Sequence, residues 1–136
     1  MRKIFFVIIT LMTFNSKAQT KGDTIFQHVE IESQILGGPI VWKLFLQANL
    51  NVDGVRDSLP RNVVRKGLKE TAVVTFTVCT DGSICDIGIE NEVNPIIKNE
   101  VLRVMKLSPK WEPGYQNGVA VKSRKRQSIT FVINNN

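Results

Sequence analysis

A strand–turn–strand pattern near the middle of the chain most constrains how it can fold. In residues 72–78 the even-numbered positions are all apolar, and two of the three odd-numbered positions are threonine. Such alternation is typical of a half-buried strand. Asp81 and Gly82 follow, and residues 84–90 return as a second strand. Because glycine takes positive φ at little cost, the Asp-Gly pair predicts a two-residue hairpin turn.

Two helical segments flank this hairpin in the sequence. Apolar residues at helical spacing, with a proline in the first turn, predict a helix over residues 39–50. Asn94 as N-cap, with a proline after it, predicts a second helix that ends near residue 107. Between the first helix and the hairpin, residues 51–60 are expected to be a loop and residues 61–68 a short helical turn.

Two further strands complete the predicted fold. Residues 29–31 alternate over a short stretch, and Ile129, Phe131 and Ile133 alternate in a last strand over residues 128–133. The order is strand, helix, hairpin, helix, strand, which indicates an α+β fold. We expect a small antiparallel sheet of three to four strands with two helices packed on one face.

The first eighteen residues have the pattern of a secretory signal peptide. Arg2 and Lys3 are basic, residues 4–14 are apolar and uncharged, and Ser16 and Ala18 are the small residues of a cleavage site after Ala18. The apolar run is about half the roughly 20 residues that a membrane-spanning helix needs. Export to the periplasm with cleavage is therefore predicted. The alternative is an uncleaved inner-membrane anchor, and only that form would contact the membrane.

Cleavage would leave residues 19–28 as a flexible lead-in and residues 29–136 as one domain. It would also lower the formal net charge of the 136-residue chain from +6 to +3, because three basic residues lie in the leader. The lower charge and the export both argue against a nucleic-acid partner.

No pattern of residues points to an enzyme or to a metal site. His28 is the only histidine, and nothing in the sequence suggests a catalytic or ligand partner for it. Nucleophile-elbow, phosphate-loop and metalloprotease motifs do not occur. Two cysteines and one histidine without ligand spacing do not predict a zinc site. We therefore expect no catalytic residue, metal or cofactor.

The register of the hairpin decides whether Cys79 and Cys85 can form a disulfide. A two-residue turn places residue 79 opposite residue 84, so the two cysteines would face opposite sides of the hairpin. A bulge or a longer loop would bring them together, and an oxidising periplasm would then favour a disulfide. The sequence leaves both outcomes open.

Five short blocks, none of them specific alone, follow one another in a set order. They cover residues 36–50, 59–67, 74–84 with Asp81 and Gly82, 108–114 with Trp111, Pro113 and Gly114, and 129–134. In this order they resemble the C-terminal domain of TonB, the periplasmic energy transducer of Gram-negative bacteria, over about residues 29–134. We expect Trp111 to be a core anchor that clamps the second helix onto the sheet.

The resemblance implies a peptide ligand. TonB C-terminal domains bind the TonB box, an extended segment of outer-membrane transporters, by adding it as a strand to their closing strand. Carried over to this chain, the peptide-binding edge consists of Ser128, Ile129, Thr130, Phe131, Val132 and Ile133. An open sheet edge can accept such a strand through its backbone. The implied partners are TonB-dependent outer-membrane transporters, and the implied role is support of TonB-dependent transmembrane transport.

Four basic residues lead into this strand: Lys122, Arg124, Lys125 and Arg126. One interpretation is a solvated flank that prevents aggregation at the edge. The other is a cluster that attracts a peptide with acidic residues.

A second function class also fits the sequence. A full TonB has an inner-membrane helix and a proline-rich spacer, and neither is evident here. The alternative is therefore a structural or assembly module, which forms a homodimer or binds another periplasmic protein through its closing strand without energy transduction.

Overall fold

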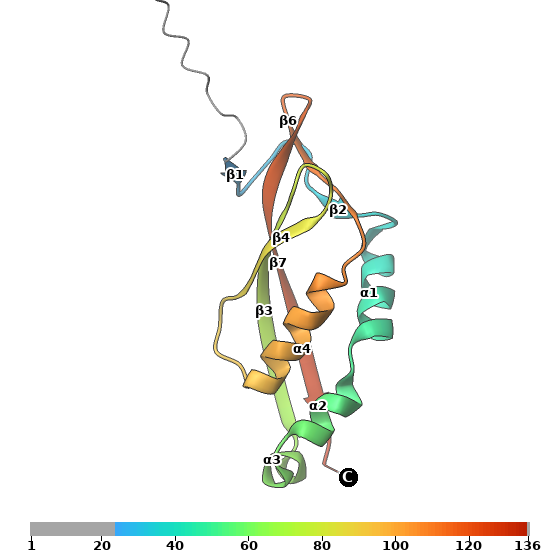
Figure 1. Cartoon of the computed structure of the whole chain (residues 1–136), viewed down its shortest axis with the longest axis vertical. Helices are drawn as coiled ribbons and strands as arrows, with labels where there is room; N and C mark the ends of the chain where they lie inside the picture. The colour runs from blue at the N-terminus through green and yellow to red at the C-terminus, as the bar shows by residue number, and fades with distance from the viewer. Residues whose placement is uncertain (1–23, 136) are drawn as a thin grey trace, which may run out of the picture.

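In the computed structural model, which describes residues 24–135, two long antiparallel strands form the centre of the main sheet (Figure 1). The order is β1-β7-β3-β4, and β6 pairs with the beginning of β7. These strands are β1 (Ile25–Phe26), β3 (Leu68–Val78), β4 (Ile84–Ile89), β6 (Gly114–Gln116) and β7 (Val119–Ile133). A separate two-stranded sheet joins β2 (Gln34–Ile35) to β5 (Trp111–Glu112). Strand β1 runs parallel to β7, and the other pairs are antiparallel.

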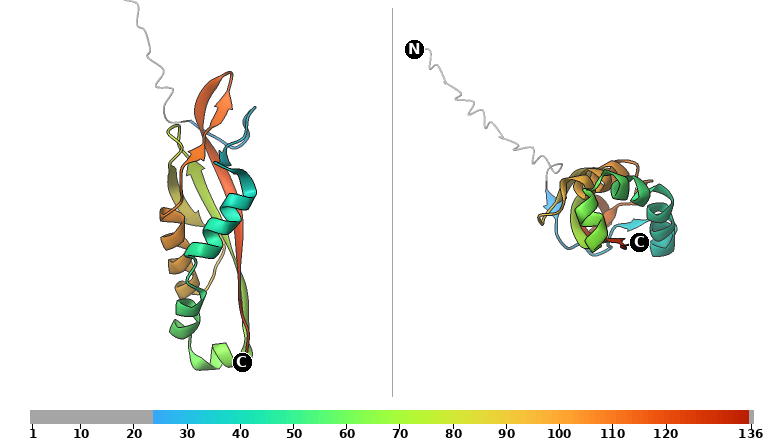
Figure 2. Two further views of the ribbon diagram at one scale, coloured as in Figure 1. Left: turned by 90° about the vertical axis from the view of Figure 1, so that its right-hand side faces the viewer. Right: turned by 90° about the horizontal axis from the view of Figure 1, so that it is seen from below.

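Helices cover one face of the sheet, as the views in Figures 1 and 2 show together. In the described part of the chain they are α1 (Gly38–Asn49), α2 (Val52–Ser58), α3 (Arg61–Lys66) and α4 (Pro95–Lys106). Helix α4 contacts β3 and β4, α2 contacts α4, and α3 lies at the end of the domain near the C-terminus (Figure 1). The α+β class is confirmed, with more helices and strands than the sequence predicted.

The core lies between α4 and the alternating face of β3. Ala72, Val74, Phe76 and Val78 are fully buried on that face, as the sequence pattern predicts. They pack with α4 residues Ile97, Val101 and Met105, and with Ile129, Phe131 and Ile133 of β7. Each buried valine, isoleucine, methionine or phenylalanine among them stabilises the fold by roughly 1.5–3 kcal/mol relative to an exposed position.

The segment expected to be a loop forms helix α2. The side chain of Asn51 caps it by accepting a hydrogen bond of 2.9 Å from the amide of Gly54, and Asp53 stands in its first turn. Val55 and Leu59 are buried against the core. The expectation of a loop was wrong because an Asp-Gly pair and a proline, which often mark turns, here lie inside a helix and just after it. Here capping and the burial of two apolar side chains outweigh the low helix propensity of glycine.

The strands also differ from the expectation at both ends of the domain. Residues 29–31 form no strand, and only a single bridge joins Ile31 to Tyr115. Strand β1 lies instead within the expected lead-in, where it pairs with β7. Strand β7 begins at Val119 rather than at residue 128, because β6 and β7 form a hairpin around Asn117 and Gly118, both with positive φ. The basic residues are thus inside the strand.

The β3–β4 turn contains three residues rather than two. The amide of Gly82 donates to the carbonyl of Cys79, and the amide of Cys79 donates to the carbonyl of Ser83, both at 2.9 Å. Gly82 has a φ of +83°, the left-handed residue that closes a three-residue hairpin loop. Residue 79 therefore stands opposite 83 rather than 84, which brings Cys85 to the same face as Cys79. The two form a disulfide with a Cα–Cα distance of 6.4 Å.

Candidate functional site

The outer side of β7 is an open edge along most of its length. On its inner side, Ser123 to Ile133 pair with β3 without interruption. On its outer side, among residues 24–135, β1 reaches only Lys122 and Ser123. Beyond that point no strand of the described chain pairs with the outer side. The strand that the sequence singled out, residues 128–133, thus lies at an edge.

The hydrogen bonds of β3 show which backbone groups of β7 point outwards. Val73 turns its carbonyl to the amide of Glu90 and its amide to Asn91 Oδ1, so both groups point away from β7. The carbonyl of Thr71 likewise accepts from Asn91 Nδ2 at 2.8 Å. In an antiparallel pair of strands, directly opposed residues behave alike. If the backbone N–H and C=O of one residue point away from the neighbouring strand, those of the residue opposite it point away as well.

Ser128 stands opposite Val73, and Thr130 stands opposite Thr71. The amides and carbonyls of Ser128 and Thr130 therefore point to the open edge, and by alternation so do those of Arg126 and Val132. Donors and acceptors two residues apart along an extended strand match the hydrogen-bonding pattern of another strand.

The side chains of this edge alternate as the sequence predicted. Ile129, Phe131 and Ile133 are buried on the helix side of the sheet, and Ser128, Thr130 and Val132 are exposed on the other side. The hydroxyl groups of Thr130 and Thr71 lie 2.8 Å apart across the two strands. A partner at this edge would be held chiefly by the backbone, because half of the side chains face the core.

A groove runs between α1 and the outer edge of β7, and sequence reasoning missed it. It has a volume of about 470 Å³ and opens to solvent. It is lined on the helix side by Trp42, Lys43, Leu46, Gln47, Leu50 and Val52, and on the strand side by residues 127–130. Figure 2 shows α1 running beside β7 in the view from the side. No local pattern could reveal this groove, since its walls are about 80 residues apart in sequence.

The basic residues of this strand are engaged with the rest of the domain. Arg124 donates to the hydroxyl oxygens of Thr75 and Thr77 at 3.2 Å, so its guanidinium lies across the helix-free face of the sheet. Lys125 pairs with Glu32 at 3.3 Å, and Arg126 pairs with Glu90 at 2.8 Å. Lys122 stands at the beginning of the run, where it pairs with Ile25 of β1. Attraction of an acidic peptide by this flank stays a prediction.

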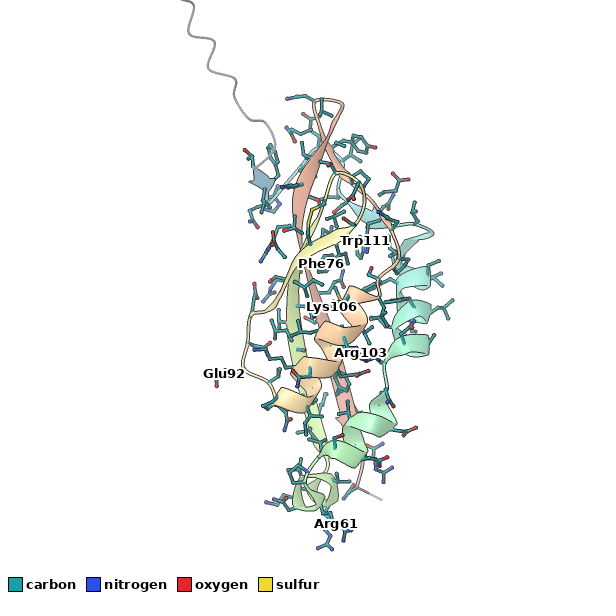
Figure 3. The ribbon with its side chains drawn as sticks, viewed as in Figure 1. Arg61, Phe76, Glu92, Arg103, Lys106 and Trp111 are labelled. Atoms are coloured by element: carbon teal, nitrogen blue, oxygen red, sulfur yellow. A yellow bond between two sulfur atoms is a disulfide. The ribbon has the colours of Figure 1, made fainter. Side chains whose placement is uncertain are left out.

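Trp111 is buried in the core, with an exposed fraction of 5%, and its ring contacts join it to β3 and α1. That it clamps the second helix onto the sheet stays a prediction. Trp111 and Phe76 of β3 are close together in Figure 3. Their rings meet edge to face with 5.2 Å between centroids, and the indole N–H of Trp111 donates to Ser108 Oγ at 3.0 Å. Its backbone amide donates to the carbonyl of Gly82 at 2.8 Å, which holds the tip of the β3–β4 hairpin. Pro113 separates β5 from β6, and the buried Gly114 begins β6.

Asp81 stabilises the same hairpin tip from its other side. Its carboxylate accepts hydrogen bonds from the hydroxyl and the amide of Ser83, at 2.6 and 2.9 Å. These bonds, with a smaller contribution from Lys110, lower the pKa of Asp81 below its ordinary value. The residue therefore serves turn geometry, as expected from its position before Gly82.

The described residues bring together no group that suggests catalysis. No cluster of three or more His, Cys, Asp or Glu side chains within residues 24–135 could hold a metal ion. His28 lines a shallow surface hollow with Gln27 and Glu90. Cys79 and Cys85 are joined to each other and are not free thiols.

Comparison with known families agrees with the arrangement of strands and helices. The sequence model of the Gram-negative bacterial TonB protein C-terminal family matches residues 56–133, more than half of the chain. The chain belongs to this family. The resemblance is thereby confirmed, although the match begins after α1 and is shorter than the expected residues 29–134. No curated protein matches the chain.

Membership in the TonB C-terminal family fits the site in general terms. Domains of this family are periplasmic in Gram-negative bacteria, interact with outer-membrane transporters and act in protein interaction and energy transduction rather than in catalysis. Among residues 24–135, no helix is both long and apolar enough to cross a membrane. The predicted signal peptide, residues 1–18, lies outside the described residues.

Proposed function

We propose that this chain is a periplasmic binding domain that engages the TonB-box segment of outer-membrane transporters by β-strand addition to β7, in support of TonB-dependent transport. The observation that carries the proposal is the outward direction of the backbone groups of Ser128 and Thr130. An extended peptide would satisfy these groups and lengthen the sheet by one strand. Family membership supports the class of partner. We also propose that residues 1–18 direct export and are removed.

Thr130→Pro tests the role of the backbone at this edge. The amide of Thr130 faces the open edge, so proline removes an outward donor without breaking a β3–β7 hydrogen bond. Thr130→Val is the matched control, because it also loses the hydroxyl contact to Thr71 but keeps the amide. Circular dichroism first establishes that both variants fold.

The measurement is a pull-down from detergent extracts of the native outer membrane with the immobilised full chain. Recovery of plug-bearing transporters by the wild type and by Thr130→Val, but not by Thr130→Pro, supports strand addition. Failure of the folded wild type to recover any transporter overturns the proposal.

The same open edge also allows two copies of the chain to pair through β7. Static light scattering over a range of concentrations detects this alternative. A concentration-dependent dimer that Thr130→Pro disrupts, together with no transporter recovery, would favour the assembly module over the transporter-binding domain.

A further inference from the structure

We propose that the peptide bound at β7 carries an apolar side chain that enters the groove beside α1, and an acidic side chain two positions away that meets Lys43. This inference rests on the proposed function, because it takes an added strand as its starting point. It specifies what the side chains of that strand must be.

Strand geometry fixes which residue of the peptide enters the groove. Directly opposed residues of neighbouring strands place their side chains on the same face of the sheet. The peptide residue opposite Ile129, between those that bond Ser128 and Thr130, therefore turns its side chain to the helix side. On that side the groove between α1 and β7 is open. The peptide residues on either side of it turn to the helix-free face.

The groove presents apolar surface to that side chain. Leu46 and Leu50 are partly buried and pack against the core, and Val52 is 41% exposed. Trp42 lines the groove between them and the β2–β5 sheet. An aliphatic side chain placed here would remove apolar surface from water on both partners, which favours its binding.

Lys43 gives the groove its charge preference. It is the one charged residue among those that line the groove, and within residues 24–135 its ammonium group has no ion-pair partner. Lys125, which precedes the groove residues of β7, already pairs with Glu32. A carboxylate on the helix side of the peptide would thus complement Lys43, at the next position on that face.

Helix α1 lies outside the part of the chain that the family model matches. The family match begins at residue 56, after the helix residues that form one wall of the groove. The backbone edge of β7 lies within the match. Strand addition and side-chain preference therefore come from different parts of the domain and can be tested separately.

The test uses fluorescein-labelled host peptides of nine residues, built from serine and threonine, and the purified full chain. Leucine and glutamate are placed two positions apart, in both orders, or at adjacent positions. Only the spacing of two puts both side chains on the helix side. Binding is measured by fluorescence anisotropy. Of the two peptides with leucine and glutamate two positions apart, one should bind roughly tenfold tighter than the peptide with adjacent leucine and glutamate. It should also bind roughly tenfold tighter than the same peptide with alanine in place of leucine.

Two substitutions in the chain, one that introduces a charge and one that reverses a charge, identify the groove as the cause. Val52→Asp should weaken binding of the leucine peptide and strengthen binding of a peptide with lysine in its place. Lys43→Glu should weaken binding of the glutamate peptide and strengthen binding of a peptide with lysine in place of glutamate. Leu44→Asp is the matched control, because Leu44 lies on α1 at 57% exposure but does not line the groove.

The two proposals fail in different ways in this experiment. Equal binding of all host peptides, lost only in Thr130→Pro, would overturn the side-chain inference and leave strand addition intact. No binding of any host peptide at millimolar concentration would overturn both. A spacing preference that Val52→Asp and Leu44→Asp change alike would also overturn the groove as its cause.

Discussion

The ring of Trp42 on α1 meets the ring of Trp111 edge to face, with 5.4 Å between centroids and 65° between planes. Trp111 in turn packs on Phe76 of β3, and Trp42 stacks on Phe45 one turn further along α1. These stacked and edge-to-face rings fasten α1, which lies outside the family match, to the part of the domain that the family model matches. The groove beside β7 therefore depends on Trp42.

Trp42→Ala should lower the free energy of unfolding by about 3–5 kcal/mol, because it removes a large buried ring and its aromatic contacts. Urea denaturation followed by circular dichroism measures this change. Leu44→Ala is the control on the exposed side of the same helix and should change the free energy by no more than about 0.5 kcal/mol. Similar losses in the two variants would contradict the anchoring role of the ring.

Gly82→Ala should destabilise the domain more than Gly118→Ala. Both glycines have positive φ, at +83° and +73°, so both variants incur about 1–2 kcal/mol of backbone strain. At Gly82 the added methyl group would also collide with the backbone carbonyl of Trp111, whereas at Gly118 it would meet open space. The difference between the two thermal unfolding curves isolates the contact with Trp111. Equal destabilisation by Gly82→Ala and Gly118→Ala would show that the hairpin tip moves away from the added methyl group without loss of stability.

The sequence predicted those parts of the fold whose signals are local. Alternation placed the buried face of β3 and of the end of β7, and the Asn94 cap with Pro95 marked the first residue of α4 correctly. The prediction failed where the same residues are compatible with both a turn and a helix. Asp53 and Gly54 are inside a helix because Asn51 caps it and Val55 finds a buried position, and neither fact is visible in the dipeptide.

The candidate site was predictable only in its strand. The alternation of Ile129, Phe131 and Ile133 indicated the edge strand, but the direction of its backbone groups depends on bonds that Val73 makes to residues after β4. The groove and the internal pairing of Arg126 with Glu90 arise from segments distant in sequence. Such contacts follow from packing, which a single sequence does not contain.

Stability should fall in acid partly through Glu100. This carboxylate accepts from Arg103 at 2.6 and 2.9 Å and from the amide of Asn51 at 2.7 Å, and these bonds lower its pKa below its ordinary value near 4.5. Because the folded state has the lower pKa, the contribution to stability is present above the ordinary pKa and is lost as the pH falls through the folded one. Glu100→Gln should therefore flatten the dependence of unfolding free energy on pH below about 4.5.

Urea denaturation from pH 7 down to pH 3 measures that dependence. Some dependence should remain in Glu100→Gln, since the pKa of Asp81 is also lowered and that carboxylate loses its hydrogen bonds in the same direction. The comparison variant is Glu92→Gln, which removes an exposed carboxylate for which no hydrogen bond or ion pair is found in residues 24–135. If Glu100→Gln and Glu92→Gln gave the same curve as the wild type, the ionised Glu100 carboxylate would contribute nothing to stability.

Loss of the disulfide should weaken the β3–β4 hairpin without unfolding the domain. Cys79 and Cys85 enclose a short loop, and closing a loop of this size in the unfolded chain is worth about 2 kcal/mol. The double variant Cys79→Ser/Cys85→Ser should lose about that much unfolding free energy, and added dithiothreitol should lower the wild type to the same level. The variant itself should not respond to the reductant. A wild type insensitive to reductant and equal in stability to the variant would show that the bond adds nothing beyond the backbone contact of Gly82 with Trp111.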